Sequence, residues 1–214
     1  RNAAVDVLLR TERGIRLEDS LNKTLRRKKL SDRGRRFLTQ LVYGTVRHRV
    51  LCDHALAPVC HQPLPELPAP IHVILRMAVF QSLFCAQVTR PAMVHTSVDL
   101  AKKRGHAGLG RLVNAVLRRA PASIDDIALP SPENDTADWL HLRYSMPRWL
   151  VDLWLDEHVA ETAARLCETL SEQAPTTLRV NTLAGTLEEL RDQLRKTGVN
   201  ADKATAIPEE LTLT

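Results

Sequence analysis

Residues 71–86 read IHVILRMAVFQSLFCA, a stretch that is apolar on nearly every face of a helix. A helix of this kind is stable in water only when other elements surround it. The first 120 residues supply such neighbours, because apolar positions such as Leu17, Leu21 and Leu25 recur there at helical spacing and strand-like alternation is absent. We predict a mainly α protein in which residues 1–120 form a bundle of six or seven helices around residues 71–86.

Several helix limits are marked by residues that favour helix ends. Ser31 offers an N-cap oxygen, and Pro70 and Pro91 suit first-turn positions, where a missing N–H costs nothing. Gly105 suits the end of a helix that begins at Pro91. These signals predict helices that begin near residues 32, 70 and 91, and a further helix over about residues 109–119.

Charge divides the chain at about Ala120. Residues 1–120 carry 22 Lys and Arg against 8 Asp and Glu, whereas residues 121–214 carry 8 against 17. The net charge of +5 for the whole chain conceals this difference. A basic half is typical of a module that binds a polyanion, most often a nucleic acid, joined to a part with another role. We therefore predict two modest domains, the first being a helical domain over residues 1–120 that binds nucleic acid.

The basic residues of the first half gather in clusters, most of them at predicted helix ends. One interpretation is that Lys and Arg at helix C-termini only complement the helix dipole and solvate the surface. Four clusters on one domain favour a phosphate-binding surface, because their mutual repulsion is relieved when phosphates replace counterions. Phe37, Phe80 and Phe84 fall on core faces, so we expect recognition of RNA backbone or shape more than of unstacked bases. The residues predicted to bind RNA here are Arg26, Arg27, Lys28, Lys29, Arg33, Arg36, Arg47, Lys102, Lys103, Arg104 and Arg118.

The second half has the composition of a connector. Residues 121–135 contain prolines and several acidic residues, which predicts an exposed linker. Residues 136–214 predict a small α+β domain. Within it, Thr186 and Glu189 have the spacing of a capping box at the start of a helix, and residues 205–214 are expected to be extended.

Residues 177–182 alternate in the manner of a strand, with Leu178 and Val180 on one face. Arg179 and Asn181 then point to the opposite face. There they could contact RNA or a further domain, or simply form a polar strand face, and the sequence favours neither interpretation. We include both residues in the predicted RNA-binding set.

Four ordered blocks of the first half resemble one family. They are D-R-x-x-R-F-x-x-x-L-V-Y-G-x-x-R over residues 32–47, LRMAVFQ over 75–81, PAMVHTSVDLA over 91–101 and VNAVLR over 113–118. Their order and spacing resemble the all-helical NusB-like fold. Two later blocks, YSMPRWLV and APTTLRVNT, are similar to the connector domain of bacterial 16S rRNA cytosine-5 methyltransferases of the Fmu/Sun type, also called RsmB. Met146 stands where that family usually has His, so no role of that imidazole is carried over.

The resemblance implies the first two parts of a three-part protein. In the family an S-adenosylmethionine-binding catalytic domain comes last, and neither its D-x-C-A-A-P-G-G-K type motif nor its Pro-Cys motif occurs in these 214 residues. We therefore expect a fragment that recognises and positions RNA, without catalytic residues or a cofactor of its own. Its full-length parent would use S-adenosylmethionine, and its partners would be small-subunit ribosomal RNA and the missing methyltransferase domain. The alternatives are an RNA-binding antitermination factor of the NusB type and a helical protein-interaction adaptor.

Two other constellations of residues carry no chemistry by this interpretation. Cys52, His54, Cys60 and His61 offer zinc-binding atoms, but adjacent Cys60 and His61 would rarely bind one tetrahedral ion. The segment His95 to Asp99, which includes Ser97, lacks a nucleophile motif and is interpreted as capping and surface groups.

The remaining composition gives expectations about compartment and state. The four cysteines, Cys52, Cys60, Cys85 and Cys167, lie in or beside apolar helical stretches, as reduced core thiols do. No apolar run reaches the roughly 18 residues of a membrane span, and no leader precedes Val5. We expect a cytoplasmic monomer that makes no membrane contact.

Overall fold

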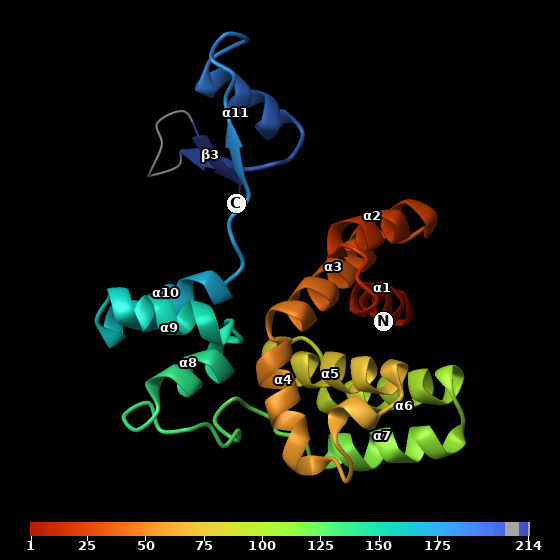
Figure 1. Ribbon diagram of the computed structural model, residues 1–214. Coiled ribbons are helices and arrows are strands. Elements are labelled where there is room, and N and C mark those ends of the chain that lie inside the picture. The colour runs from red at the N-terminus through yellow and green to blue at the C-terminus, as the bar shows by residue number, and fades with distance from the viewer. Residues whose placement is uncertain (204–209, 214) are drawn as a thin grey trace. The chain divides into compact units, whose positions relative to one another are not determined.

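The computed structural model describes residues 1–203 and 210–213, and Figure 1 shows the order of the elements. The chain divides into two compact units, Arg1–Ser171 and Glu172–Thr214. The predicted mainly α fold with a small α+β portion is confirmed, and among the described residues no helix is both long and apolar enough to cross a membrane. The first unit contains α1 (Asn2–Glu12), α2 (Leu17–Arg27), α3 (Asp32–Arg47), α4 (Arg49–Leu56), the short 3-10 helices η1 (Ala57–Val59) and η2 (Leu64–Glu66), α5 (Ala69–Phe84), α6 (Arg90–Arg104), α7 (Ala107–Arg119), α8 (Thr136–Tyr144), α9 (Arg148–Glu157) and α10 (Ala160–Ser171). The second contains β1 (Thr177–Arg179), α11 (Leu187–Lys196), β2 (Ala201–Lys203) and β3 (Glu210–Leu213).

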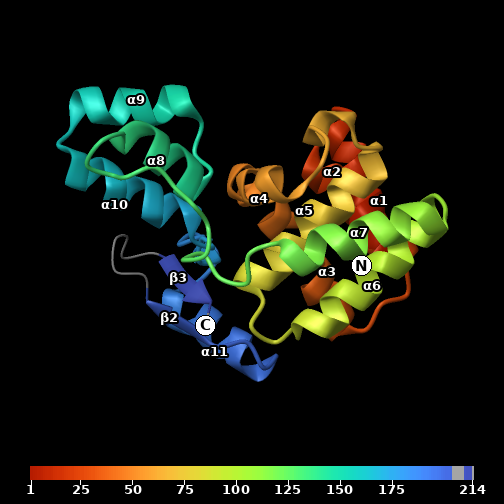
Figure 2. The same ribbon diagram turned by 90° about the horizontal axis from the view of Figure 1, so that it is seen from below.

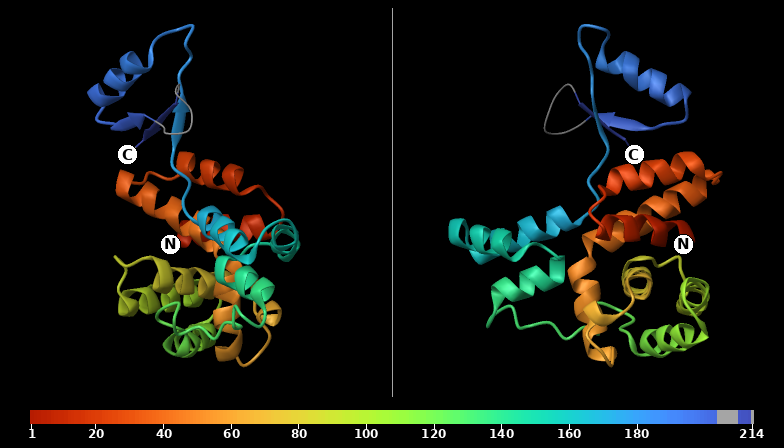
Figure 3. Two further views of the ribbon diagram at one scale, coloured as in Figure 1. Left: turned by 90° about the vertical axis from the view of Figure 1, so that its left-hand side faces the viewer. Right: turned by 45° about the vertical axis from the view of Figure 1, so that its right-hand side comes forward.

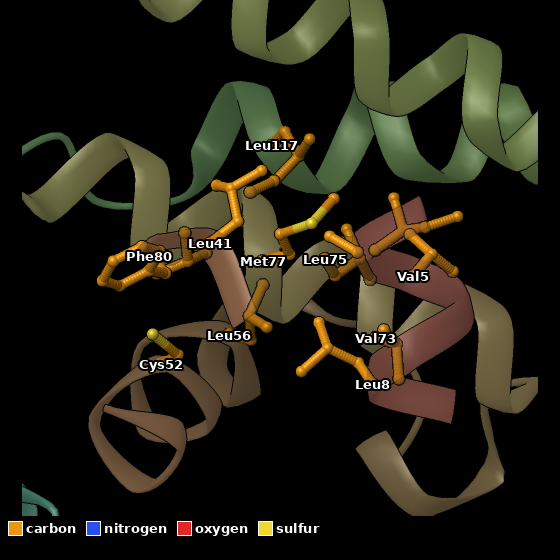
Figure 4. Packing of buried hydrophobic residues seen from close by; sticks show 14 of the residues in the cluster. Val5, Leu8, Leu41, Cys52, Leu56, Val73, Leu75, Met77, Phe80 and Leu117 are labelled. Carbon is orange, nitrogen blue, oxygen red and sulfur yellow. The ribbon is translucent and has the colours of Figure 1, made fainter. Parts of the chain in front are cut away.

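Helix α5 lies at the centre of the bundle, as its apolar sequence predicts. Leu75 and Met77 are fully buried and Phe80 is 3% exposed, and α5 contacts α1, α3, α4, α6 and α7. Figure 4 shows these three side chains with labelled residues of α1, α3, α4 and α7 around them. The other helices of the bundle are therefore organised around α5.

The helix limits follow the predicted end signals. The Ser31 hydroxyl caps α3 by accepting a hydrogen bond from the backbone N–H of Gly34 at 3.2 Å. Pro70 and Pro91 lie in the first turns of α5 and α6. Helix α7 begins earlier than predicted, at Ala107, because the His106 imidazole caps it by accepting a hydrogen bond from the Gly108 N–H.

Helices α3 and α5 cross closely at Gly44. A Cβ atom added to Gly44 would lie 2.0 Å from Cζ of Phe80 and 2.4 Å from its Cε2. The Phe80 ring has little room to move, since it is 3% exposed and lies near-parallel to the His48 and Phe84 rings. Gly44 is therefore required by packing in the middle of a helix, where glycine otherwise lowers stability.

Replacing Gly44 with Ala is expected to lower the free energy of unfolding by about 2 kcal/mol, because the cost of overpacking exceeds the gain in helix propensity. Urea denaturation followed by circular dichroism measures the change. Gly34→Ala is the matched control in the same helix, since its added Cβ would meet only the Ser31 hydroxyl oxygen, at 3.3 Å, and the Leu30 Cβ, at 3.7 Å. Equal losses in the two variants would show that helix α3 tolerates a methyl group at Gly44.

A charged network lies inside this apolar bundle. The Arg76 guanidinium, with its side chain 10% exposed, donates two hydrogen bonds to the Asp53 carboxylate, at 2.8 and 2.7 Å, and one to Glu12. The His72 Nε2 lies 3.0 Å from the same Asp53 carboxylate. Burial alone would raise the pKa of Asp53, but the hydrogen bonds and charges of His72 and Arg76 lower it overall. The network joins α1, α4 and α5 in one place.

Residues 121–135 lead from α7 to α8, and most of them are exposed, as predicted for a linker. The segment is nevertheless attached to the bundle. Ile127 is 8% exposed and belongs to the bundle core, and the His54 Nε2 lies 2.8 Å from the carbonyl oxygen of Ala128. The Asp126 carboxylate accepts hydrogen bonds from the backbone N–H groups of Ser123 and Ala122, which lower the pKa of Asp126.

Helices α8, α9 and α10 pack on one another around a small core of Leu140, Val151, Ala163 and Cys167 (Figure 2). Helix α8 also contacts α4. Ser145, which follows α8 with a left-handed φ of 56°, accepts a hydrogen bond from the Leu51 N–H at 3.0 Å. That N–H is one of the unpaired donors at the start of α4.

These contacts group α8–α10 with the bundle, so the compact units divide after Ser171 and not near Ala120. The domain limits of 1–120, 121–135 and 136–214 stay a prediction.

The second unit is a three-stranded antiparallel sheet of order β1-β3-β2, with α11 alongside it (Figure 3). Leu178 pairs with Leu211, which is fully buried, and Ala201 pairs with Leu213. The predicted capping box is confirmed, because Thr186 and Glu189 exchange side-chain to backbone hydrogen bonds at the start of α11. Of the predicted extended segment, residues 210–213 form β3, and residues 205–209 and 214 lie outside the described residues.

Candidate nucleic-acid interface

One group of predicted residues lies where α2 ends and α3 begins (Figure 1). Arg26 and Arg27 occupy the last turn of α2, Lys28 and Lys29 follow it, and the Ser31 cap starts α3 immediately afterwards. All of the basic side chains here are exposed, and within the described residues none forms an ion pair with an acid. We call this group the basic corner; its members are Arg26, Arg27, Lys28, Lys29, Arg33 and Arg36.

The basic corner presents a concentrated positive field to solvent. Arg35, in the same turn, donates a hydrogen bond to the carbonyl oxygen of Leu25 at 3.1 Å, which ties the start of α3 to the end of α2. The Arg35 side chain thus helps to hold the corner in place, while the charges of the six corner residues stay accessible. Exposed, uncompensated Lys and Arg are the groups that exchange counterions for phosphates.

Arg47 lies apart from the basic corner, at the opposite end of α3. Fourteen residues of helix separate it from Arg33, a distance of about 21 Å. It is half-buried beside His48, whose ring stacks on Phe84 at 3.9 Å between centroids. Burial, followed by the charges of Arg47 and Arg143, lowers the pKa of His48 to about 4.

Arg143 of α8 was not among the predicted residues, although its charge acts on His48 together with that of Arg47. No periodic pattern could have found it, because Arg143 and Arg47 are distant in the chain and belong to different predicted domains.

The basic residues at the end of α6 differ from one another. Lys102 and Lys103 are exposed. Arg104 instead donates a hydrogen bond to the Asp6 carboxylate at 2.7 Å and others to Asn2, which fastens the end of α6 to α1. The guanidinium of Arg104 therefore has a structural role in the bundle, and its binding of RNA stays a prediction.

The basic residues at the end of α7 also differ from one another. Arg118 is exposed, whereas Arg119 donates a hydrogen bond to the carbonyl oxygen of Val59 at 2.7 Å. Arg90 donates to the carbonyl oxygens of Leu117 and Ala120, at 3.0 and 2.6 Å, and so caps α7 from the start of α6. Because α6 and α7 run antiparallel, Lys102 and Arg118 lie at opposite ends of the pair.

Arg179 and Asn181 belong to the second unit. Arg179 is an exposed residue of β1. The expectation that Asn181 lies on a strand face is wrong, since β1 ends at Arg179 and the Asn181 Oδ1 accepts a hydrogen bond from the Leu183 N–H at 3.1 Å. The side chain of Asn181 thus closes an Asx turn, a local bond that competes with the strand.

The residues considered for zinc binding or catalysis lie in the bundle core or in surface contacts. Cys52 is fully buried, which raises the pKa of its thiol, and within residues 1–203 and 210–213 no three His, Cys, Asp or Glu side chains gather as a metal site requires. The His95 imidazole lies 3.3 Å from the Asp99 carboxylate on the surface. The prediction that Ser97 is a capping or surface group is wrong, because Ser97 is fully buried on the core side of α6.

The helical bundle with its basic corner has known relatives. Residues 1–121, which hold α1–α7, match the NusB family. The chain belongs to the NusB family. Residues 146–214 of this NusB-family chain match a second description, the ferredoxin-like domain of RsmF/B-like methyltransferases. Both parts of the resemblance drawn from the sequence are thereby confirmed.

Two curated proteins and one solved structure show how far the likeness extends. A probable ribosomal RNA small subunit methyltransferase B of Bacillus subtilis is 32% identical over 95% of this chain and 45% of its own length. A transcription antitermination protein NusB of a Roseiflexus species is 32% identical over 44% of this chain and 69% of its own length. The crystal structure of PH0851 is 19% identical, with a TM-score of 0.64, over 100% of this chain and 48% of that one, which supports the fold. The NusB-family chain thus spans less than half the length of the methyltransferase relative.

The residues present do not fit S-adenosylmethionine, the cofactor that the methyltransferase resemblance implies. The closely spaced glycines of this NusB-family chain, Gly105, Gly108 and Gly110, lie where α6 ends and α7 begins, whereas a nucleotide-binding glycine turn follows a strand. The space beside these glycines is also already filled, because an added Cβ atom would lie 2.4 Å from Leu109 at Gly105 and 2.7 Å from Lys102 at Gly110. No room is left there for the cofactor. These glycines admit neighbouring side chains of the bundle.

Proposed function

We propose that this chain is the RNA-recognition and positioning portion of an S-adenosylmethionine-dependent rRNA cytosine-C5 methyltransferase. It holds small-subunit ribosomal RNA and carries out no methyl transfer itself. The cofactor, the catalytic residues and the reaction belong to a methyltransferase domain outside these residues, and the assembly works in the cytoplasm.

The observation that carries this proposal is the order of two matches on one chain. A NusB-family bundle over residues 1–121 precedes a ferredoxin-like domain of the RsmF/B type over residues 146–214. The B. subtilis methyltransferase relative aligns with 95% of the chain, so it includes both parts. The basic corner supplies the exposed positive charge that RNA phosphates require.

A salt titration tests whether the chain binds RNA through phosphates. We expect the logarithm of the binding constant for a small-subunit rRNA hairpin to fall linearly with the logarithm of salt concentration, with a slope of about −5 if all six corner residues neutralise phosphates. Fluorescence anisotropy at rising KCl measures it. A slope near zero would contradict RNA binding and favour the helical protein-interaction adaptor.

The antitermination alternative rests on the NusB-family match and on the Roseiflexus relative, which covers 44% of this chain. It accounts for residues 1–121 but gives no role to the ferredoxin-like match over residues 146–214. A chain that required a ribosomal protein partner for all of its RNA binding would favour antitermination, whereas we expect this chain to bind the hairpin alone, as a monomer.

A further inference from the structure

A groove runs between α6 and α7, away from the basic corner. The two helices lie side by side and antiparallel (Figure 1), and the groove has a volume of about 410 Å³. Its lining combines apolar side chains with polar and basic ones. Its lining residues are Arg90, Pro91, Val94, His95, Val98, Asn114 and Arg118.

The floor of the groove is formed by Val94 and Val98. Both are half-buried and pack against the bundle core, and they lie one turn apart on the same face of α6. They are the two valine side chains that supply the apolar part of the groove lining. Phosphate groups gain nothing from such a surface, because burying a charge beside apolar side chains is costly.

Asn114 stands at the side of this floor and has no partner for its amide. It is half-buried, and within residues 1–203 and 210–213 its side-chain oxygen and nitrogen make no hydrogen bond. An amide presents a donor and an acceptor side by side, which is the pattern on the edges of nucleobases. A half-buried amide without a partner is satisfied by a ligand or by water.

Positive charge flanks the floor at both ends. Arg90 and Arg118 lie at one end of the groove. At the other end Arg111 is exposed, and the aliphatic part of Lys102 covers Gly110, where an added Cβ would meet Lys102 Cγ at 2.7 Å. Arg111 and Arg118 are seven residues apart on α7, or about 10 Å. The ends of the groove thus suit the phosphates on either side of one bound base.

We propose that this groove binds an unpaired nucleotide of the RNA, with its base on Val94 and Val98 and its edge hydrogen-bonded to the Asn114 amide. Arg118 and Arg111 contact the flanking phosphates. A paired base is excluded, because its edge is occupied and it cannot reach a floor between two helices. This inference rests on the proposed function and adds base contact to the backbone recognition that the basic corner provides.

The test compares two RNAs of one sequence, a single strand and a blunt duplex, by fluorescence anisotropy with the whole chain. Asn114→Ala is expected to weaken binding of the single strand about tenfold and to leave binding of the duplex unchanged. Asn114→Asp, which keeps the shape of the side chain but adds negative charge, is expected to weaken binding of the single strand further. Asn134→Ala is the matched control, because Asn134 is exposed in the linker and its side-chain amide also makes no hydrogen bond within the described residues.

The outcomes separate this inference from the proposed function. If the wild-type chain binds RNA but Asn114→Ala changes neither affinity, or lowers both equally, the groove does not hold a base, and a protein segment becomes the better occupant. A wild-type chain that binds the duplex alone overturns the groove in the same way. A wild-type chain that binds neither RNA contradicts the proposed function and the groove together. Circular dichroism of each variant confirms that helix content is unchanged.

Discussion

Replacing both Arg33 and Arg36 with Glu is expected to weaken binding of the chain to an rRNA hairpin about a hundredfold near physiological salt, with helix content unchanged. Both side chains are exposed in the first turns of α3, and neither has an acidic partner among the described residues. Each loses a solvent-exposed contact with phosphate worth up to about 1 kcal/mol, and each new carboxylate repels phosphate, so that the two changes together approach the roughly 2.7 kcal/mol of a hundredfold loss. The fold does not suffer, since acidic residues at a helix N-terminus interact favourably with its dipole.

Arg47→Glu serves as a separate variant, because Arg47 lies about 21 Å from Arg33 along α3. If the RNA covers the whole length of α3, Arg47→Glu weakens binding further in the triple variant. If the RNA stays at the basic corner, the double and triple variants bind alike. Either result measures the extent of the contact surface.

A control of equal net charge separates a local contact from a general electrostatic effect. Arg165 in α10 and Arg195 in α11 are exposed and have no ion pair among the described residues. Changing both to Glu alters the net charge of the chain by the same amount as the Arg33 and Arg36 pair. Equal loss of affinity in the two double variants would contradict a specific role for the basic corner.

Much of the fold could be predicted because its determinants are local. The stretch over residues 71–86 is apolar on nearly every face, so its composition alone predicts that the helix, α5, is buried. The caps at Ser31 and Thr186 depend on residues only three positions away. By contrast, the attachment of α8–α10 to the bundle includes the hydrogen bond between Leu51 and Ser145, which are 94 residues apart. No local pattern records such a contact.

The candidate interface divides in the same way. The basic corner could be predicted because its members lie within residues 26–36, where the short connection from α2 to α3 must keep them together. The engagement of Arg104 by Asp6 could not be predicted, since the two residues meet only when α6 packs on α1. The turn at Asn181 is different, because its signal was present. Asn side chains commonly accept a hydrogen bond from the backbone two residues on, and this tendency outweighed the alternation that predicted a longer strand.

Replacing Arg76 with Met is expected to lower the free energy of unfolding by about 3 kcal/mol. The apolar length of the side chain is preserved, so the loss reports on the charged network and not on a cavity. In the variant the Asp53 carboxylate keeps His72 but loses both hydrogen bonds from Arg76, and it stays partly buried as an unmatched charge. Urea denaturation measures the change.

The matched control is the double variant Asp53→Asn with Arg76→Met, which removes the carboxylate together with its guanidinium partner. Removing both charges of a buried pair costs less than removing one. We therefore expect the double variant to recover more than 1 kcal/mol relative to Arg76→Met alone. The single variant Asp53→Asn completes the comparison. A loss of stability in the double variant equal to the sum of the losses in Asp53→Asn and Arg76→Met would contradict a coupled network.

The pH dependence of the unfolding free energy, compared between the wild type and Arg76→Met, gives an independent measurement. In the wild type the pKa of Asp53 is held below its ordinary value, so the stability that its carboxylate provides is present above about pH 4 and is lost as the pH falls below that value. In Arg76→Met burial outweighs the remaining hydrogen bond and raises the pKa of Asp53 above the ordinary value. Protonation of Asp53 then removes the unmatched charge, so Arg76→Met loses less stability relative to the wild type in acid than at neutral pH. The difference in unfolding free energy between the two chains is expected to narrow between pH 7 and pH 3, and a constant difference over that range would show that the loss comes from packing.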